Sequence, residues 1–330
     1  MNYFAADGRY IVIFCRNIRI NQLGKVNNMT LTEEIEQLKS EKNAVILAHY
    51  YVRPEVQQVA DYIGDSFYLS KVAAGLKQKT IVFCGVSFMG ESAKILSPDK
   101  RVLMPDLTAD CPMAHMADAE TIAEMREKYE DLAVVCYINS TSELKMHSDV
   151  CVTSANAVEI VKALPNQNIF FIPDKNLAHF VAEQAPEKHF VFHTGYCPTH
   201  EHMKCEEVKA LKAAHPDAKV LAHPECSEAV RAAADYLGST SGIIQYATKD
   251  EGQEFIICTE EGVNYELQKK NPGKRFYYPD TAPVCPDMKK NTLEKLRDAL
   301  REGENEVQVS GEVRRLSRLS LEKMHELAGA

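Results

Sequence analysis

The sequence predicts an α/β fold of three repeated three-layer α/β/α sandwich domains, whose parallel sheets are arranged with pseudo-threefold symmetry. Three observations support this fold class. A single Asp recurs as Asp61, Asp149 and Asp235, at spacings of 88 and 86 residues. Each Asp follows an apolar strand, a loop and a helix, and a hydroxyl residue comes five positions later. Two more apolar strands then follow in each copy, with helices between them, as βαβ units require.

The elements of the three copies correspond in order. The first strands are expected at 44–51, 133–139 and 218–225, the second at 81–83, 169–171 and 255–257, and the third at 102–104, 190–192 and 276–278. Helices are expected at 66–76, 89–96, 155–164 and 289–301. A single TIM barrel is the alternative architecture. The number of strands in each repeat and the late helix fit separate layers better.

The repeats predict a division of the chain into five parts. These are an N-terminal extension (1–28), three α/β repeats (29–128, 129–215 and 216–288), and a C-terminal helical segment (289–330) expected to pack back on the first repeat. The first helix should begin after Met29, with Thr30 or Thr32 as its N-cap. Met29 is an alternative start of the chain, and the extension is expected to be dispensable. Its apolar stretch at 10–15 lacks a small-residue cleavage site and does not resemble a signal peptide.

The composition argues against two classes of partner. The net charge is −9, and no cluster of Lys and Arg stands out, so no nucleic-acid surface is expected. No apolar run approaches the roughly 18 residues needed to cross a membrane. Because nothing indicates secretion, the ten cysteines predict a cytoplasmic metal or catalytic protein and not a disulfide scaffold.

Three of the ten cysteines occupy the same place in the repeat. Cys111, Cys197 and Cys285 lie 48 to 50 residues after the Asp of their copy, just past the third strand, and each precedes a Pro. Because ligands gather at the carboxyl ends of parallel strands, threefold symmetry would bring these thiols to one central point. Three thiolates suit a [4Fe–4S] cluster with one iron left open as a Lewis acid. Buried structural cysteines, or a zinc ion with three Cys ligands and an open position, are the alternatives.

The hydroxyl residues that follow each repeated Asp are Ser66, Ser154 and Thr240, each just before an expected helix. Ordinary N-capping would explain any one of them. Three helix N-termini that face the centre would together form an anion site of backbone N–H groups and helix dipoles. Such a site would let an acidic protein bind carboxylates and phosphate.

The loops after the first strands carry side chains suited to proton transfer. They are His49 and Tyr51 in the first copy, Tyr137 and Asn139 in the second, and His223 and Glu225 in the third. Matching positions at strand ends favour a shared site over separate structural roles. His200 is a further candidate, because its neighbour Cys197, three residues earlier, would lie at the metal.

Several runs of residues, taken together, resemble the quinolinate synthase family. They are LAHYY at 47–51, ADYIGDS at 60–66, ESAKIL at 91–96, TSANA at 153–157, GYCPTH at 195–200, AHPEC at 222–226 and CPDMK at 285–289. The match extends in order from about residue 29 to about residue 300. The resemblance implies condensation of iminoaspartate (iminosuccinate) with dihydroxyacetone phosphate to quinolinate, phosphate and water, in the biosynthesis of NAD from aspartate.

The resemblance also implies roles for individual residues. It implies one [4Fe–4S] cluster held by Cys111, Cys197 and Cys285, with one open iron site. Proton transfer is expected at Tyr51, His200 and Glu225. The expected substrate contacts are His49, Ser66, Tyr137, Ile138, Asn139, Ser154, His223, Pro224, Glu225 and Thr240. The expected functional partner is an enzyme that supplies iminoaspartate, either L-aspartate oxidase or aspartate dehydrogenase.

The chain departs from the family's usual residues at a few positions, namely Val52, Ser87, Gly90, Asp110 and Cys258. These departures bear on the shape of the pocket and not on the reaction. Two other functions fit part of the pattern. A cluster-dependent hydro-lyase of a hydroxy acid would share the open iron but need no triose phosphate site. An iron–sulfur redox protein would normally use a fourth protein ligand, and no fourth cysteine obeys the repeat.

Overall fold

Three separate parallel sheets form the core of residues 29–281 and 283–329, which the computed structural model describes. The predicted extension 1–28 lies outside these residues. The strand order of the first sheet is β2 (Tyr62–Gly64), β1 (Ala44–His49), β3 (Thr80–Cys84) and β4 (Arg101–Leu103). The order of the second is β6 (Val150–Val152), β5 (Leu132–Tyr137), β7 (Asn168–Ile172) and β8 (His189–Phe192). The order of the third is β10 (Tyr236–Leu237), β9 (Lys219–Ala222), β11 (Glu254–Cys258) and β12 (Arg275–Tyr277). The repeated α/β fold is confirmed. The single barrel is wrong, because the described strands form three sheets and do not close into one.

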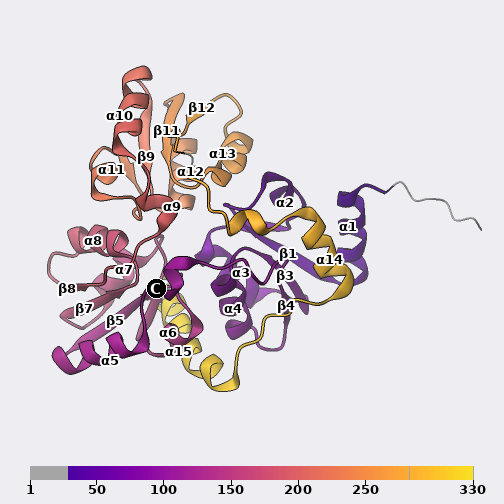
Figure 1. The fold of residues 1–330 in the computed structure, drawn as a ribbon, viewed down its shortest axis with the longest axis horizontal. Helices are drawn as coiled ribbons and strands as arrows, with labels where there is room; N and C mark the ends of the chain where they lie inside the picture. Colours follow the sequence, from indigo (N-terminus) through magenta and orange to yellow (C-terminus); the bar gives the residue numbers. More distant parts are fainter. Residues whose placement is uncertain (1–28, 282, 330) are drawn as a thin grey trace, which may run out of the picture.

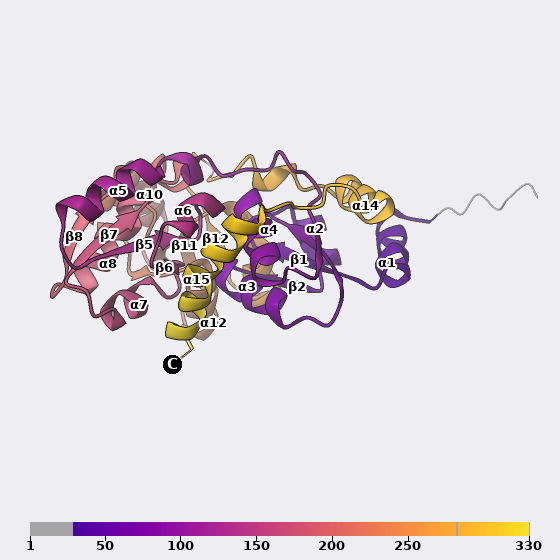
Figure 2. The same ribbon diagram turned by 90° about the horizontal axis from the view of Figure 1, so that it is seen from below.

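The three sheets form three lobes around a common centre (Figure 1). Seen from the side, the molecule is flattened, with the lobes next to one another (Figure 2). All described strand pairs within the sheets are parallel, so the carboxyl ends of each sheet's strands share one edge. The loops that leave these edges are the ones that carry the predicted site residues.

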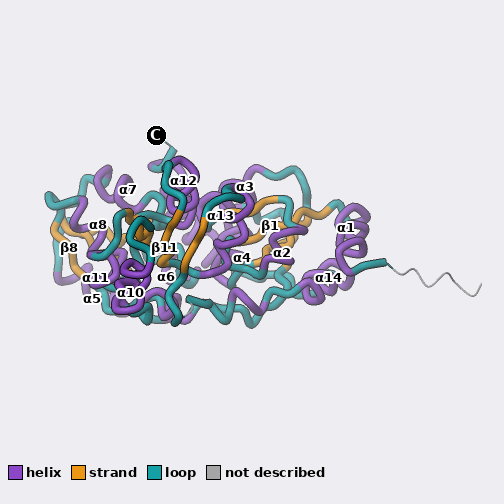
Figure 3. The backbone as a smooth tube through the Cα atoms, turned by 90° about the horizontal axis from the view of Figure 1, so that it is seen from above, coloured by secondary structure: helices purple, strands orange, loops and turns teal. Residues whose placement is uncertain are grey.

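Helices flank the strands in each lobe (Figure 3). In the first lobe, α1 (Leu31–Glu41), α2 (Pro54–Val59) and α14 (Leu293–Glu302) contact one another, while α3 (Ser66–Gly75) and α4 (Ser87–Leu96) form a second group. The remaining helices and 3-10 turns are η1 (Pro112–His115), α5 (Ala119–Lys128), α6 (Ser142–Met146), α7 (Ala157–Ala163), α8 (Lys175–Gln184), α9 (Pro198–Glu201), α10 (Cys205–Ala214), α11 (Glu228–Ala232), α12 (Thr240–Lys249), η2 (Glu261–Val263), α13 (Asn264–Lys270), η3 (Met288–Lys290) and α15 (Gly311–Leu327). None of the described helices has the length and apolarity needed to cross a bilayer.

The repeated Asp has a structural reason. Its carboxylate accepts the backbone N–H of the first strand fifteen residues earlier, over 2.8 Å for Asp61 and Ile46, 2.7 Å for Asp149 and Val134, and 2.8 Å for Asp235 and Val220. The backbone N–H of each Asp also donates to the carbonyl of that same residue. This double contact joins the residue just before β2, β6 or β10 to the first strand of its sheet, β1, β5 or β9. A short side chain with an acceptor oxygen makes this contact in each repeat, which gives the recurring Asp a structural role.

Two features of the fold differ from the prediction. Each sheet has four strands, because the short strands β2, β6 and β10 follow directly after the repeated Asp. Strands of two or three residues carry too little hydrophobic pattern to be recognised. The C-terminal segment also reaches further than expected: α14 packs on α1, α2 and β3 of the first repeat, whereas α15 packs mainly on α6, β6 and α7 of the second and on α4. The short helix α6 leaves part of that face for α15 to cover.

The start of α1 follows the predicted capping. The Thr30 hydroxyl accepts the N–H of Glu33, and the Glu33 carboxylate accepts the N–H of Thr30, so the two residues form a capping box. The division of the chain at 29–128, 129–215 and 216–288 stays a prediction.

Candidate active site and metal centre

One pocket at the centre of the three lobes collects most of the predicted site residues. Its lining includes residues from the strand-end loops of all three repeats, and twelve of them were predicted: His49, Tyr51, Ser66, Cys111, Tyr137, Asn139, Ser154, Cys197, His200, Glu225, Thr240 and Cys285. Three predicted residues do not line it. Ile138 and Pro224 are buried beside lining residues, and His223 lies behind Ser154, with 3.1 Å between His223 Nε2 and Ser154 Oγ.

A chain of hydrogen bonds crosses the pocket and joins side chains from all three repeats. Glu225 Oε2 lies 2.9 Å from His200 Nδ1, and His200 Nε2 lies 2.9 Å from Thr259 Oγ1. The Tyr51 hydroxyl lies 2.7 Å from Thr259 Oγ1 and 2.6 Å from Thr240 Oγ1. An imidazole whose Nδ1–H donates to a carboxylate presents Nε2 as an acceptor. The chain can therefore carry a proton from Tyr51 through Thr259 to His200.

Thr259 is the functional residue that the sequence reasoning missed. It is fully buried and follows β11 directly, at the carboxyl edge of the third sheet. The corresponding positions after β3 and β7 hold Gly85 and Pro173, so the repeat offers no hydroxyl for comparison. Its position directly after a strand, at the edge from which the site loops leave, was the signal available.

The carboxyl group of Glu225 is ionised at neutral pH. Burial alone would raise the pKa of this carboxyl, but the neighbouring His200 and His223 outweigh it and lower the pKa to about 2. One of its oxygens, Oε1, has no hydrogen-bond partner among the described residues, and neither has Asn139 Oδ1, although both atoms are buried. Two buried acceptors without donors cost free energy unless a ligand supplies the donors. The pocket is thus suited to a ligand with hydroxyl or N–H groups.

Two histidines and two tyrosines near Glu225 have pKa values shifted towards their neutral forms. Burial lowers the pKa of both His49 and His223 to about 3. Burial also raises the pKa of Tyr51 and Tyr137 well above the ordinary value, with Glu225 as the next cause in both cases. A tyrosine in this environment keeps its proton until a base accepts it. Tyr51 is connected to His200 through Thr259, whereas Tyr137 lies beside Glu225 itself.

These two histidines predict acid sensitivity. The unfolded chain takes up a proton on His49 and on His223 near pH 6.5, whereas the folded protein does so near pH 3. The contribution of these histidines to the free energy of unfolding is therefore fully present above pH 6.5. It is lost as the pH falls towards 3, by about 1.4 kcal/mol per pH unit for each histidine. Urea unfolding at several pH values measures this slope. We expect a shallower slope in His223→Asn than in the exposed control His147→Asn, and equal slopes would contradict the assignment.

The three cysteines share one local structure. Each is a free thiol, partly buried in the pocket wall, and each is followed by Pro and a short helical turn: η1 after Cys111, α9 after Cys197 and η3 after Cys285. Backbone N–H groups of these turns lie near the sulfur atoms, from Met113 and Ala114 in the first copy and from His200 in the second, where those of Ala114 and His200 also donate to the cysteine carbonyls. Hydrogen bonds of this kind stabilise a metal-bound thiolate.

The thiols of the pocket suit a metal better than a role as inert core residues. Burial raises the pKa of Cys111, and the nearby Cys285 raises it further; burial is also the main cause for Cys197, followed by Glu225 and Cys111. Three thiols close enough to affect one another's ionisation, with backbone donors already facing sulfur, fit a metal that takes thiolates. Such a metal deprotonates its thiol ligands on binding.

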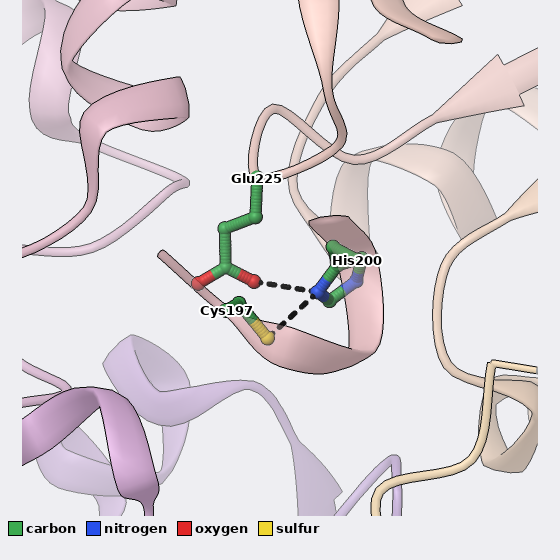
Figure 4. A group of neighbouring side chains, drawn as sticks. All are labelled: Cys197, His200 and Glu225. Atoms are coloured by element: carbon green, nitrogen blue, oxygen red, sulfur yellow. Dashed lines mark hydrogen bonds and ion pairs between the residues drawn. The ribbon is translucent and has the colours of Figure 1, made fainter. Parts of the chain in front are cut away.

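A second set of donors lies beside the thiols. Cys197 Sγ, His200 Nδ1 and a Glu225 oxygen lie within 4.8 Å of one another, with 3.2 Å between the sulfur and the imidazole nitrogen (Figure 4). Cys111 and Cys285 do not belong to this close group. His200 already contacts Glu225 and Thr259 through its two nitrogens. We therefore assign His200 to the hydrogen-bond chain.

The recurrent hydroxyls are not the helix caps. Asp65 caps α3 and Ser239 caps α12, so Ser66 and Thr240 occupy the first helical position, and α7 begins three residues after Ser154. N-capping is therefore the wrong explanation for these three residues. The Ser66 and Thr240 hydroxyls line the pocket next to the N-termini of ten-residue helices, where backbone N–H groups and the helix dipole favour an anion.

The chain was compared with known proteins. A model of the family described as Quinolinate synthetase A protein matches residues 33–326. A relative named quinolinate synthase from Fusobacterium nucleatum is 54% identical over 299 residues, which are 91% of this chain and 100% of the relative. The proteins of the same name from Clostridioides difficile and from a Sulfurihydrogenibium species are 52% and 45% identical, over 90% and 91% of this chain and 98% and 99% of their own length. The family match begins after the predicted extension.

Proposed function

The chain belongs to the Quinolinate synthetase A protein family, and from this membership and its central pocket we propose that it is a quinolinate synthase. In this proposal it condenses iminoaspartate with dihydroxyacetone phosphate to quinolinate, phosphate and water for NAD biosynthesis. The observation that carries the proposal is the meeting, in one pocket, of three cysteine thiols and the hydrogen-bond chain from Glu225 to Tyr51. That combination suits dehydration, which needs a Lewis acid and a proton-transfer path.

The cofactor in this proposal is an iron–sulfur cluster on Cys111, Cys197 and Cys285. When bound, a [4Fe–4S] cluster with three Cys ligands supplies a Lewis acid at its open iron. The three helical turns after the cysteines support this assignment, because their N–H groups face the sulfur atoms. The donor set of three thiols is also softer than a magnesium or calcium site would use.

The chain's own residues move the protons. Tyr51 is partly buried in the pocket wall, and the Thr259 hydroxyl beside it connects it to His200 Nε2. As Tyr51 gives up its proton to Thr259, Thr259 passes its own proton to His200. The imidazolium that forms is stabilised by the ionised Glu225 at 2.9 Å. The resulting phenolate of Tyr51 can remove a proton from bound substrate, and the reverse transfers return it to a leaving oxygen.

Other residues bind and orient the substrates. The N-termini of α3 and α12, with Ser66 and Thr240, are suited to carboxylate and phosphate groups. Glu225 Oε1 and Asn139 Oδ1 are suited to donors such as a hydroxyl or an imine N–H. The predicted supplier of iminoaspartate, L-aspartate oxidase or aspartate dehydrogenase, and the cytoplasmic location stay predictions.

An anaerobic assay tests the proposed function. The purified protein should contain iron and sulfide, and it should form quinolinate and release phosphate in equal amounts from iminoaspartate and dihydroxyacetone phosphate. A hydro-lyase of a hydroxy acid would release no phosphate, and a redox protein would form neither product. Iron and sulfide without quinolinate formation would contradict the proposed reaction, and quinolinate formation without iron would contradict the proposed cofactor.

A further inference from the structure

A carboxylate holds the backbone of each of the three pocket cysteines. The N–H of Cys197 donates to Asp174 Oδ2 over 3.0 Å, and the N–H of Cys285 donates to Glu260 Oε1 over 3.1 Å. Asp174 and Glu260 occupy the same place in their repeats, two residues after the ends of β7 and β11. Both are fully buried. The correspondence between the second and third repeats thus extends from the thiols to the groups behind them.

Each of these two carboxylates uses its other oxygen to hold a neighbouring element. Asp174 Oδ1 accepts the N–H of Leu177 over 2.7 Å and so caps α8. Glu260 Oε2 accepts the N–H of Gly262 over 2.7 Å at the start of η2. A single side chain therefore joins the strand end, the following helix and the cysteine loop. Such a triple connection fixes the loop backbone without any ligand.

The first repeat reaches the same result by another route. Its residue two positions after β3 is Val86, which has no acceptor for an N–H. The N–H of Cys111 donates instead to Asp110 Oδ1 over 2.8 Å. The Ser87 hydroxyl donates to the same oxygen, and His115 Nε2 lies 2.6 Å from Asp110 Oδ2. Where the repeat lacks its carboxylate, the neighbouring residue provides one.

A loop that is already fixed loses less conformational entropy when its thiol binds metal. The turns that follow also bring backbone N–H groups near the sulfur, from Met113 and Ala114 in the case of Cys111. We propose that Asp110, Asp174 and Glu260 are positioning residues that preset the three cysteine loops, so that the thiol site exists before the cluster binds. This inference rests on the proposed metal centre and adds the residues that build it.

Asp110 is the best place for a test, because its side chain is 43% exposed and its replacement leaves the core intact. Holoenzyme purified without oxygen is titrated with a chelator, and the loss of the cluster's visible absorption gives the chelator concentration at half loss. Removing a partner behind a metal ligand usually costs 10- to 100-fold in metal affinity. We expect the half-loss concentration of Asp110→Ala to fall by about 10- to 100-fold.

Two variants control this experiment. In Asp110→Asn the amide oxygen still accepts the Cys111 N–H, so this variant should retain iron within about threefold of the wild type, well short of the loss expected for Ala. Asp118→Ala removes an exposed N-cap of α5 in the same segment and should retain iron like the wild type. Iron retention in Asp110→Ala equal to the wild type, or loss in Asp110→Asn equal to Ala, would overturn the inference alone. A wild-type protein without iron would overturn the metal centre and the inference together.

Discussion

Replacing Cys111, Cys197 or Cys285 with Ser is expected to remove the cluster and to abolish quinolinate formation. Iron–sulfur clusters require thiolate ligands, and a serine hydroxyl is both harder and far less acidic. The three thiols come from three different lobes, and no other described cysteine lines the pocket to replace a lost one. Iron and sulfide content, visible absorption and turnover measured on each variant under anaerobic conditions provide the check.

Cys205→Ser is the matched control for these variants. Cys205 is also a free and nearly buried cysteine, and its thiol donates to the Ala229 carbonyl over 3.2 Å, a contact that a serine hydroxyl can keep. It lies at the start of α10, outside the pocket. This variant should retain full cluster content and activity. A wild-type cluster in Cys285→Ser, or equal losses in Cys205→Ser and Cys285→Ser, would show that the three-cysteine assignment is wrong.

The parts of the fold and site that repeat could be predicted from the sequence. Asp61, Asp149 and Asp235 mark the repeat because each makes the same pair of contacts to its first strand. The grouping of the three cysteines could be predicted from the same repeat spacing. Each lies after the last strand of its repeat (β4, β8 or β12) and precedes a helical turn. Threefold symmetry turns equal sequence positions into neighbours in space, and this is why the sequence alone indicated a shared pocket.

The parts that break the repeat could not be predicted. Thr259 corresponds to Gly85 and Pro173 in the other copies, so nothing marked it as part of the hydrogen-bond chain. The carboxylate that holds the Cys111 backbone belongs to Asp110, next to the cysteine. In the other two copies the carboxylate comes from a residue after β7 or β11. The hydrogen-bond chain needs one bridging hydroxyl, and Thr259 of the third repeat supplies it. The equivalent positions of the other two repeats are therefore free to hold other residues. Asymmetry of this kind is expected wherever a symmetric fold binds asymmetric substrates.

Glu225→Gln is expected to lower turnover by about 10²-fold or more while the cluster and substrate binding are retained, the usual scale for a general acid–base group. The amide keeps the size of the side chain, and its oxygen can still accept a hydrogen bond from His200 Nδ1. Glu225 Oε2 lies 2.9 Å from that nitrogen. It has no charge to stabilise an imidazolium, so His200 becomes a weaker acceptor for the proton of Tyr51. Cluster absorption, the KM of each substrate and kcat, measured together, separate this loss from a loss of binding.

Thr259 provides the decisive comparison, because it touches both His200 and Tyr51 and lies outside the contacts expected for the substrates. Thr259→Val keeps the shape of the side chain but removes the hydroxyl. That hydroxyl lies 2.9 Å from His200 Nε2 and 2.7 Å from the Tyr51 hydroxyl, so the variant interrupts the chain between them. Residues that act as one unit give losses that do not add. The double variant of Thr259→Val and Glu225→Gln should therefore be about as slow as the slower single variant, and Thr259→Ser should recover most of the activity. Additive losses, or near-normal turnover of Glu225→Gln with its cluster intact, would mean that Glu225 only binds substrate and that the proton of Tyr51 leaves by another path.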